Sequence, residues 1–277
     1  MTRELHIYLD GEPLQTTCRL HLRGRNEMTL NPTVFQLDLY LPSENIIGQL
    51  SSGRKIAVHS TFDSVLATGT ILDVLSDTRD GKQITSVIFS DGIPFTGSFV
   101  SASFPADTSL KTITESLLYS SSVPLPLAGF TARDRTYSLG TSFFGSAADS
   151  LQSLAVDLNA DVFLFRSAIY MLGRDTTPDI IDLTSEDVLD AVSSGKDVRI
   201  LTTSMKGWPI GSILRYRQKP PSMREVDASA AGRSNPSREY SGQLICQTFD
   251  ADTGEGPWST RIILQAKEAV SLPLQCY

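Results

Sequence analysis

Two copies of one short sequence pattern occur in the chain, and this duplication limits the possible folds more than any other feature. The first copy spans residues 69–89 and the second spans residues 242–264. In both copies a glycine is followed by two branched aliphatic residues, by an aspartate at the eighth position after it and by a second glycine at the twelfth. The matching residues are Gly69, Asp77 and Gly81 in the first copy and Gly242, Asp250 and Gly254 in the second.

Each copy is predicted to form two β-strands around a polar turn. Asp and Gly near the tip suit a tight connection, because they tolerate the positive φ angles that such turns require. A matching strand start also precedes each copy, at Gly53 and at Gly211. The sequence therefore predicts two similar β modules in one chain.

The segments around the first copy show strand patterns as well. Apolar and polar residues alternate over residues 4–9 and 17–22, which predicts a hairpin with one buried face. The alternation returns over residues 34–41 and stops at Pro42, because a prolyl nitrogen cannot donate to a strand ladder. Strands joined by short turns, without a helical pattern between them, predict an antiparallel barrel or sandwich over residues 1–104.

Residues 105–195 have a different pattern and are predicted to form a small α+β insert. Helix-capping residues and apolar positions at helical spacing indicate three helices, and two short apolar runs indicate strands. The predicted helices begin at Asp107 or Thr108, at Ser146 and at Thr184, and the predicted strands are residues 161–165 and 168–172. Strand patterns then return, so residues 196–277 are expected to form the second β module.

A segment with almost no branched apolar residues interrupts the second module. Residues 219–239 are rich in Pro, Ser, Ala and Arg, so they cannot bury enough apolar surface to become ordered by themselves. We expect a mobile loop that becomes ordered against a partner, with Arg224, Arg233 and Arg238 as candidate contacts. The alternative is a solvated hairpin extension without a partner.

Composition excludes several classes of protein. The net charge is −7, with 24 Lys and Arg against 31 Asp and Glu, which argues against a surface built to grip phosphate backbones. The N-terminus has no apolar signal-peptide core, and no run of about 18 apolar residues occurs, so no membrane contact is predicted. The three cysteines, Cys18, Cys246 and Cys276, are widely separated and are expected to be reduced, as in a protein made in the cytoplasm.

No catalytic, cofactor or metal motif is predicted. His6, His21 and His59 all fall in expected strands, and none has a second ligand at metal-binding spacing. Asp77 and Asp250 could take part in carboxylate pairs for hydrolysis. However, they recur at equivalent positions near turns, where Asp commonly accepts a hydrogen bond from its own backbone. Nucleophile-elbow, Walker, zinc-protease and dinucleotide-binding motifs are not found in the sequence.

The order of the parts points to a family. The run FVSASFPADTSLKTITESLL at residues 99–118 is followed by a run at residues 137–174 that ends in YMLGR, and WPIGSILRY then leads into the second module. This layout resembles the baseplate hub, or tail hub, proteins of contractile-tailed bacteriophages and related contractile injection systems. The resemblance covers most of the chain and rests on layout and short motifs.

The resemblance implies a mainly β protein, α+β overall, with two tube-type antiparallel β-barrels that flank the insert. It also implies a structural, non-enzymatic homotrimer in which six modules form a ring of pseudo-sixfold symmetry. Such a ring links the hexameric tail tube to the trimeric spike, contacts other baseplate proteins and lets DNA pass through its channel without specific binding. The protein would then reside in the virion, in the tail baseplate, and the six repeat residues would be interface candidates.

Two other functions remain open at this stage. A carbohydrate- or receptor-binding baseplate protein could stack sugars on Trp208 or Trp258, and its glycan affinity would depend on them. A tail-associated cell-wall hydrolase would instead clear peptidoglycan in a zymogram. Each predicts a measurable activity that a structural hub does not need.

Overall fold

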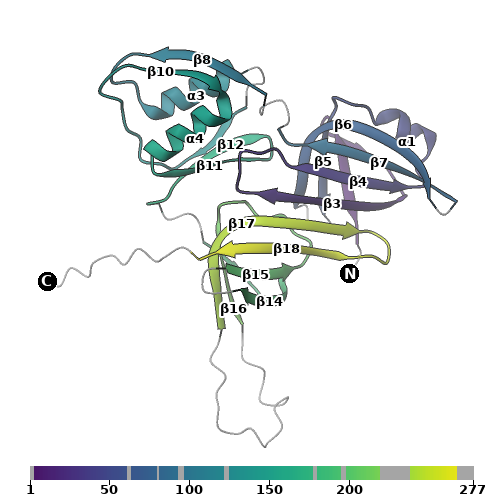
Figure 1. The fold of residues 1–277 in the computed structure, drawn as a ribbon. Helices are drawn as coiled ribbons and strands as arrows, with labels where there is room; N and C mark the ends of the chain where they lie inside the picture. The colour runs from purple at the N-terminus through teal and green to yellow at the C-terminus, as the bar shows by residue number, and fades with distance from the viewer. Residues whose placement is uncertain are drawn as a thin grey trace, which may run out of the picture.

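The computed structural model describes residues 3–60, 64–79, 81–92, 97–121, 125–176, 180–194, 198–218 and 238–266. The protein is mainly β, as the sequence predicts, and its helices are few and short. Figure 1 shows two sheet-rich parts beside each other and a smaller part that carries two helices. Among the described residues, no helix is long and apolar enough to cross a membrane.

Within its described residues, the first β module contains seven strands and one short helix, α1 (Glu44–Gln49). Its strands are β1 (Leu5–Leu9), β2 (Glu12–Leu14), β3 (Arg19–Glu27), β4 (Val34–Tyr40), β5 (Lys55–Ser60), β6 (Val65–Arg79) and β7 (Lys82–Ser90). They pair in the order β3-β4-β7-β6-β5-β1-β2. Alternate residues of each strand enter one apolar core, in which Leu22, Leu37 and Val87 are fully buried.

The second β module repeats this arrangement near the C-terminus. Its strands are β13 (Ile180–Leu183), β14 (Val188–Ser194), β15 (Val198–Thr203), β16 (Ile213–Gln218), β17 (Arg238–Asp252) and β18 (Trp258–Gln265). Strands β14, β15, β18 and β17 pair in that order, β16 pairs with β17, and β13 pairs with β16. A separate apolar core fills this module, with Leu201, Leu244 and Ile262 fully buried.

The insert between the modules has its own core. It consists of β8 (Phe99–Phe104), α3 (Leu110–Ser120), β9 (Leu127–Phe130), β10 (Thr141–Ser146), α4 (Ala147–Asp157), β11 (Ala160–Phe165) and β12 (Ala168–Gly173). Helix α4 begins as predicted, because the Ser146 hydroxyl accepts the amide hydrogen of Asp149. Helix α3 is capped by Ser109, one or two residues after the predicted position. Strands β11 and β12 occupy the predicted segments and pair with each other.

The predicted hairpin between residues 4–9 and 17–22 is wrong. Strand β1 turns back at Asp10 and Gly11, both at positive φ, and pairs with β2, which lies inside the predicted turn. Its other edge pairs with β5. Because β2 and β5 occupy both edges of β1, β3 pairs elsewhere, with β4 on one side and β17 on the other.

The helix predicted from Thr184 is also wrong. The Asp187 carboxylate accepts hydrogen bonds from the amide and the hydroxyl of Thr184, as a cap would. However, the segment makes only one turn and then continues as β14, in which Val188 and Val192 pair with β15. β-branched residues favour a pleated strand over a helix, and pairing with β15 fixes that choice.

The three-part division at residues 1–104, 105–195 and 196–277 remains a proposal. Strand pairing favours somewhat different limits, since β8 pairs with β10 of the insert and β13 pairs with β16 of the second module. The described structure also contains three separate core clusters, one for each part.

The turn between β11 and β12 fixes the insert to the first module. Arg166 stands in this turn at a φ of 52°, and its Nη2 donates to the carbonyl oxygen of Val65 over 2.6 Å. Leu164 packs so closely on Gly92 that a Cβ atom at Gly92 would collide with it. Asp91 is buried next to this contact and accepts the amide hydrogen of Thr33 over 2.9 Å. Burial raises the pKa of Asp91 to about 6, against the effect of its backbone hydrogen bonds.

The raised pKa of Asp91 predicts how stability changes with pH. The ordinary pKa of the carboxyl group is 3.8, and in the folded protein it is about 6. The folded state therefore binds more protons between these values, so the free energy of unfolding falls as the pH rises through this window. Asp91→Asn keeps an oxygen acceptor for Thr33 and should remove this fall. It should also raise the free energy of unfolding at pH 7 by roughly 1–3 kcal/mol.

Urea unfolding between pH 4 and pH 7 measures this difference. Asp107→Asn removes an exposed carboxylate from the insert and serves as the control. It should change neither the free energy of unfolding nor its pH dependence appreciably. An Asp91→Asn protein with the same pH slope as the unchanged protein would contradict the prediction.

Candidate assembly interface

The two predicted repeat copies form hairpins with the same register. In the first, Ile71 pairs with Phe89 and Asp73 with Ile88, so Leu72 is an extra residue in β6. In the second, Leu244 pairs with Leu264 and Cys246 with Ile263, so Ile245 is the extra residue in β17. Asp77 and Asp250 lie at equivalent positions, opposite Ile84 and Ser259. The predicted duplication is thus confirmed down to a shared β-bulge.

The first glycine of each copy allows a close approach between strands. A Cβ atom at Gly69 would collide with the carbonyl oxygen of Ser90, and one at Gly242 would collide with that of Gln265. Ser90 and Gln265 are themselves equivalent positions of β7 and β18. The repeated glycine is therefore explained by the same steric need in both modules.

The upstream glycines are equivalent as well. Gly53 has a φ of 89° and Gly211 a φ of 88°. The amide of Gly53 donates to the carbonyl oxygen of Ile71, and that of Gly211 donates to Leu244, over 2.8 and 2.9 Å. Since Ile71 and Leu244 are equivalent, each module begins its repeat with the same left-handed turn.

The second glycines of the copies differ. Gly81 stands at the hairpin tip with a φ of 72°, as the turn prediction requires. Gly254 instead lies against Arg19, whose Nε would be 2.6 Å from an added Cβ atom. The tip of the second hairpin is therefore shaped by a contact with the first module.

That contact belongs to a continuous strand junction between the modules. Strand β17 pairs antiparallel with β3, from Cys246 opposite Glu27 to Asp252 opposite His21. Figure 1 shows β17 between β3 and β18, so one sheet runs through both modules. Backbone hydrogen bonds of this kind join the modules without a linker.

Ion pairs on one face of the junction reinforce it. The guanidinium of Arg19 donates two hydrogen bonds to the Asp252 carboxylate, and the distance from Nε to Oδ1 is 2.8 Å. Asp252 is almost fully buried and also accepts the amide hydrogen of Gly254 over 2.8 Å. The Arg19 hydrogen bond is the main reason that the pKa of Asp252 is lowered. Two residues along, His21 Nε2 lies 2.7 Å from Oδ1 of Asp250.

Two strand edges have no strand partner in the described part of the chain. Residues 73–79 of β6 pair only with β7, and β14 pairs only with β15. Large apolar side chains are exposed along both edges: Leu75 to 49%, Leu189 to 63% and Val192 to 52%. Unpaired edges with apolar side chains readily pair with another chain. These two edges are therefore candidate assembly surfaces.

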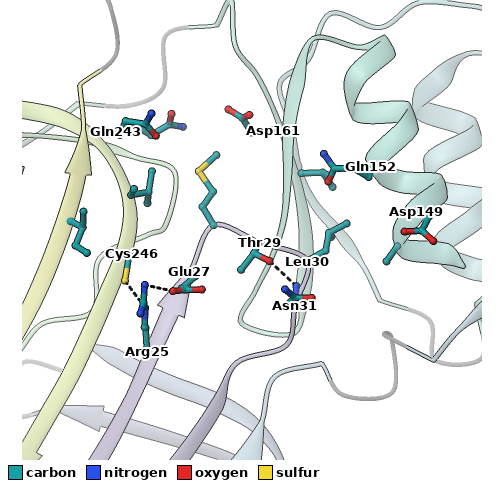
Figure 2. Close-up of a pocket in the computed structure, with 16 residues that line it drawn as sticks. Arg25, Glu27, Thr29, Leu30, Asn31, Asp149, Gln152, Asp161, Gln243 and Cys246 are labelled. Carbon is teal, nitrogen blue, oxygen red and sulfur yellow. Dashed lines mark hydrogen bonds and ion pairs between the residues drawn. The ribbon is translucent and has the colours of Figure 1, made fainter. Parts of the chain in front are cut away.

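A cleft of about 690 Å³ opens where the insert meets both modules. Figure 2 shows Arg25 between Cys246 and Glu27 on one wall of this cleft and Asp161 on another. Arg25 Nε donates to Cys246 Sγ over 3.1 Å and the guanidinium pairs with Glu27, while Asp161 pairs with Arg174. Two of the three acidic residues that line the cleft, Glu27 and Asp161, are thus held in ion pairs.

Other predicted site residues have different outcomes. Residues 219–237, which include Arg224 and Arg233, lie outside the described residues, so the loop prediction is not tested. Arg238 and Glu239 begin strand β17 and pair with β16, so the predicted loop is too long at its C-terminal end. Among the described residues, no group of three or more His, Cys, Asp or Glu could hold a metal ion.

Two acidic residues of β17, Asp250 and Asp252, are expected to contribute differently to the free energy of unfolding. Asp252→Ala should lower the free energy of unfolding by about 2–4 kcal/mol, because it leaves Arg19 and the Gly254 amide without their acceptor in a buried junction. Asp250→Ala should cost less than about 1 kcal/mol, because that carboxylate is half exposed. Urea unfolding of both variants measures the contrast, and equal losses would contradict the assigned role of the Arg19–Asp252 pair.

Comparison with known proteins relates this architecture to viral tails. No protein-family model and no curated protein matches the sequence. Among solved structures, a 43 kDa tail protein of prophage MuSo2 from Shewanella oneidensis is 10% identical, with a TM-score of 0.66, over 96% of this chain and 97% of that one. A tail protein from Neisseria meningitidis MC58 is 10% identical, with a TM-score of 0.64, over the same shares of both chains.

A third similar structure comes from Escherichia coli. It is described as a component of the type VI secretion system with structural similarity to the T4 bacteriophage tail proteins gp27 and gp5. It is 10% identical, with a TM-score of 0.59, over 95% of this chain and 77% of that one. The chain therefore has the fold of phage tail proteins and of this secretion-system component.

Proposed function

We propose that this protein is a structural hub of a phage tail baseplate, or of a related contractile injection system. Three copies form a homotrimer around a central channel, and their six β modules make a ring of pseudo-sixfold symmetry. One side of the ring meets the hexameric tail tube and the other meets the trimeric spike. The protein resides in the virion, and DNA passes through the channel without specific binding.

The main observation that supports this proposal is the equivalence of the two hairpins. Both have the same register, the same bulge and the same close approach at the first glycine. A trimer joins a sixfold partner with equal contacts only if each chain supplies two similar surfaces, related by about 60° in the ring. The fold shared with tail proteins and with a secretion-system component supports the same role.

Differences between the modules support the threefold side of the proposal. Strand β5 is flanked by the antiparallel strand β1, whereas its counterpart β16 is flanked by the parallel strand β13. The insert has its own core and occurs once in each chain. A ring of three copies would therefore present three equivalent positions to a threefold partner, as well as six similar ones to a sixfold partner.

A non-enzymatic role is part of this proposal. Acidic groups of the junction and of the cleft take part in ion pairs, as in Arg19–Asp252, Arg25–Glu27 and Arg174–Asp161. Asp91, the carboxyl group whose pKa burial raises to about 6, lies beneath the insert and contacts backbone groups. These arrangements stabilise a scaffold and do not present a reactive group to a substrate.

Self-association at accessible concentrations is the first expected property of such a hub. Sedimentation velocity should show a monomer that converts to a three-chain species as concentration rises. The melting temperature should rise with it, because association stabilises the folded chain by mass action. A monomer with an unchanged melting temperature over about a hundredfold range in concentration would contradict the proposal.

A further inference from the structure

The strand junction inside the chain provides a template for contacts between chains. In this junction Ala251 of β17 lies opposite Leu22 of β3. The amide of Thr253 donates to the carbonyl oxygen of Leu20, and the amide of Met28 donates to the carbonyl oxygen of Ile245, over 2.9 Å in each case. In an antiparallel ladder hydrogen-bonded pairs alternate with non-bonded ones, so Ala251 and Leu22 form a bonded pair.

Because the two modules are equivalent, the counterparts of Ala251 and Leu22 can be found on the two unpaired edges. The shared hairpin register makes Thr78 of β6 the counterpart of Ala251. On the other side, the pairing series Leu22–Leu37–Val87 in the first module corresponds to Ala191–Leu201–Ile262 in the second. Ala191 of β14 is therefore the counterpart of Leu22, and the same docking between two chains places Thr78 opposite Ala191.

In the described part of the chain, the backbone amides of Thr78 and Ala191 are hydrogen-bonded to local side chains and not to a neighbouring strand. The amide of Thr78 donates to the carboxylate of Asp77 over 2.7 Å, and the amide of Ala191 donates to that of Asp190 over 2.8 Å. The side chain of the preceding residue thus accepts the amide hydrogen of each of these two residues, which strand pairing would use instead. In the internal junction, the carboxylate of Asp250, the counterpart of Asp77, accepts from His21 instead.

Exposed apolar side chains fit the same register. One position along from the Thr78–Ala191 pair, Asp77 falls opposite Val192. Leu75 then lies diagonally next to Val192 on the same face. Both apolar side chains are about half exposed in the single chain. Docking would bury them against each other, on the face that carries the Arg19–Asp252 and His21–Asp250 ion pairs in the internal junction.

We propose that the edge of β6 at residues 73–79 pairs antiparallel with β14 of a second copy, with Thr78 opposite Ala191. Asp77 and Asp190 cap these edges in the single chain and release the amides on docking. This inference rests on the proposed hub and specifies the contact between its copies. It also gives each edge the strand partner that it lacks in the described part of the chain.

Cysteine cross-linking tests the register. Thr78→Cys and Ala191→Cys are introduced together, with Cys18 and Cys276 replaced by Ser. Under mild oxidation the pair should give covalent dimers and trimers on a non-reducing gel, because the Cα atoms of a directly opposed, hydrogen-bonded pair lie about 5.5 Å apart, within the Cα range that a disulfide spans. The matched control combines Thr78→Cys with Ser193→Cys, two residues away on the same face, where the diagonal distance of about 7–8 Å is too long.

The outcomes separate this inference from the proposed function. Cross-linking of the Thr78 and Ala191 pair, with none in the control, supports the register. A three-chain species in sedimentation without that cross-link would overturn the register and leave the hub proposal standing. A protein that stays monomeric at all concentrations would overturn both.

The capping role of Asp190 has its own test. Asp190→Ala frees the Ala191 amide, so the association constant should rise by about 2- to 10-fold, as expected for one backbone hydrogen bond that no longer has to be exchanged. Glu115→Ala on α3 removes the same charge away from both edges and should leave association unchanged. An equal effect of the two variants would show that charge alone is responsible and would overturn the capping role.

Discussion

The backbone groups along a strand edge are the constraint on which this structure depends. Each unpaired amide and carbonyl must find a partner or water, and a long unpaired edge invites another chain. At the edge of β3 the partner is β17 of the same chain, and the result is one sheet through two modules. The equivalent edges of β6 and β14 meet no such partner within the described chain, and local aspartates accept the amide hydrogens of Thr78 and Ala191.

The insert gives the two joined modules a fixed support. Arg166 reaches the first module at Val65, and Leu164 packs on Gly92 in a contact that leaves no room for a side chain. The cost is a buried carboxyl group at Asp91 with a raised pKa. A rigid contact of this kind suits the structural role proposed above.

Much of the fold could be predicted from local patterns. Strand alternation and the glycine spacing gave both hairpins, and Ser146 with Asp149 gave the start of α4, because these signals act over a few residues. The wrong predictions concern choices made by distant partners: β1 pairs with β5 instead of β3, and the segment after Thr184 becomes a strand because β15 lies next to it. The junction residues Arg19 and His21 gave no signal in sequence, since their partners lie more than 200 residues away.

The central claim is that the two modules are equivalent building units of one closed ring. Electron cryo-microscopy of the concentrated protein tests it most directly, because class averages along the ring axis resolve both the number of lobes and their differences. The account predicts a closed ring of six similar lobes with true threefold symmetry, in which inserts mark alternate positions. Rings with three lobes, open chains of copies or single molecules alone would contradict it.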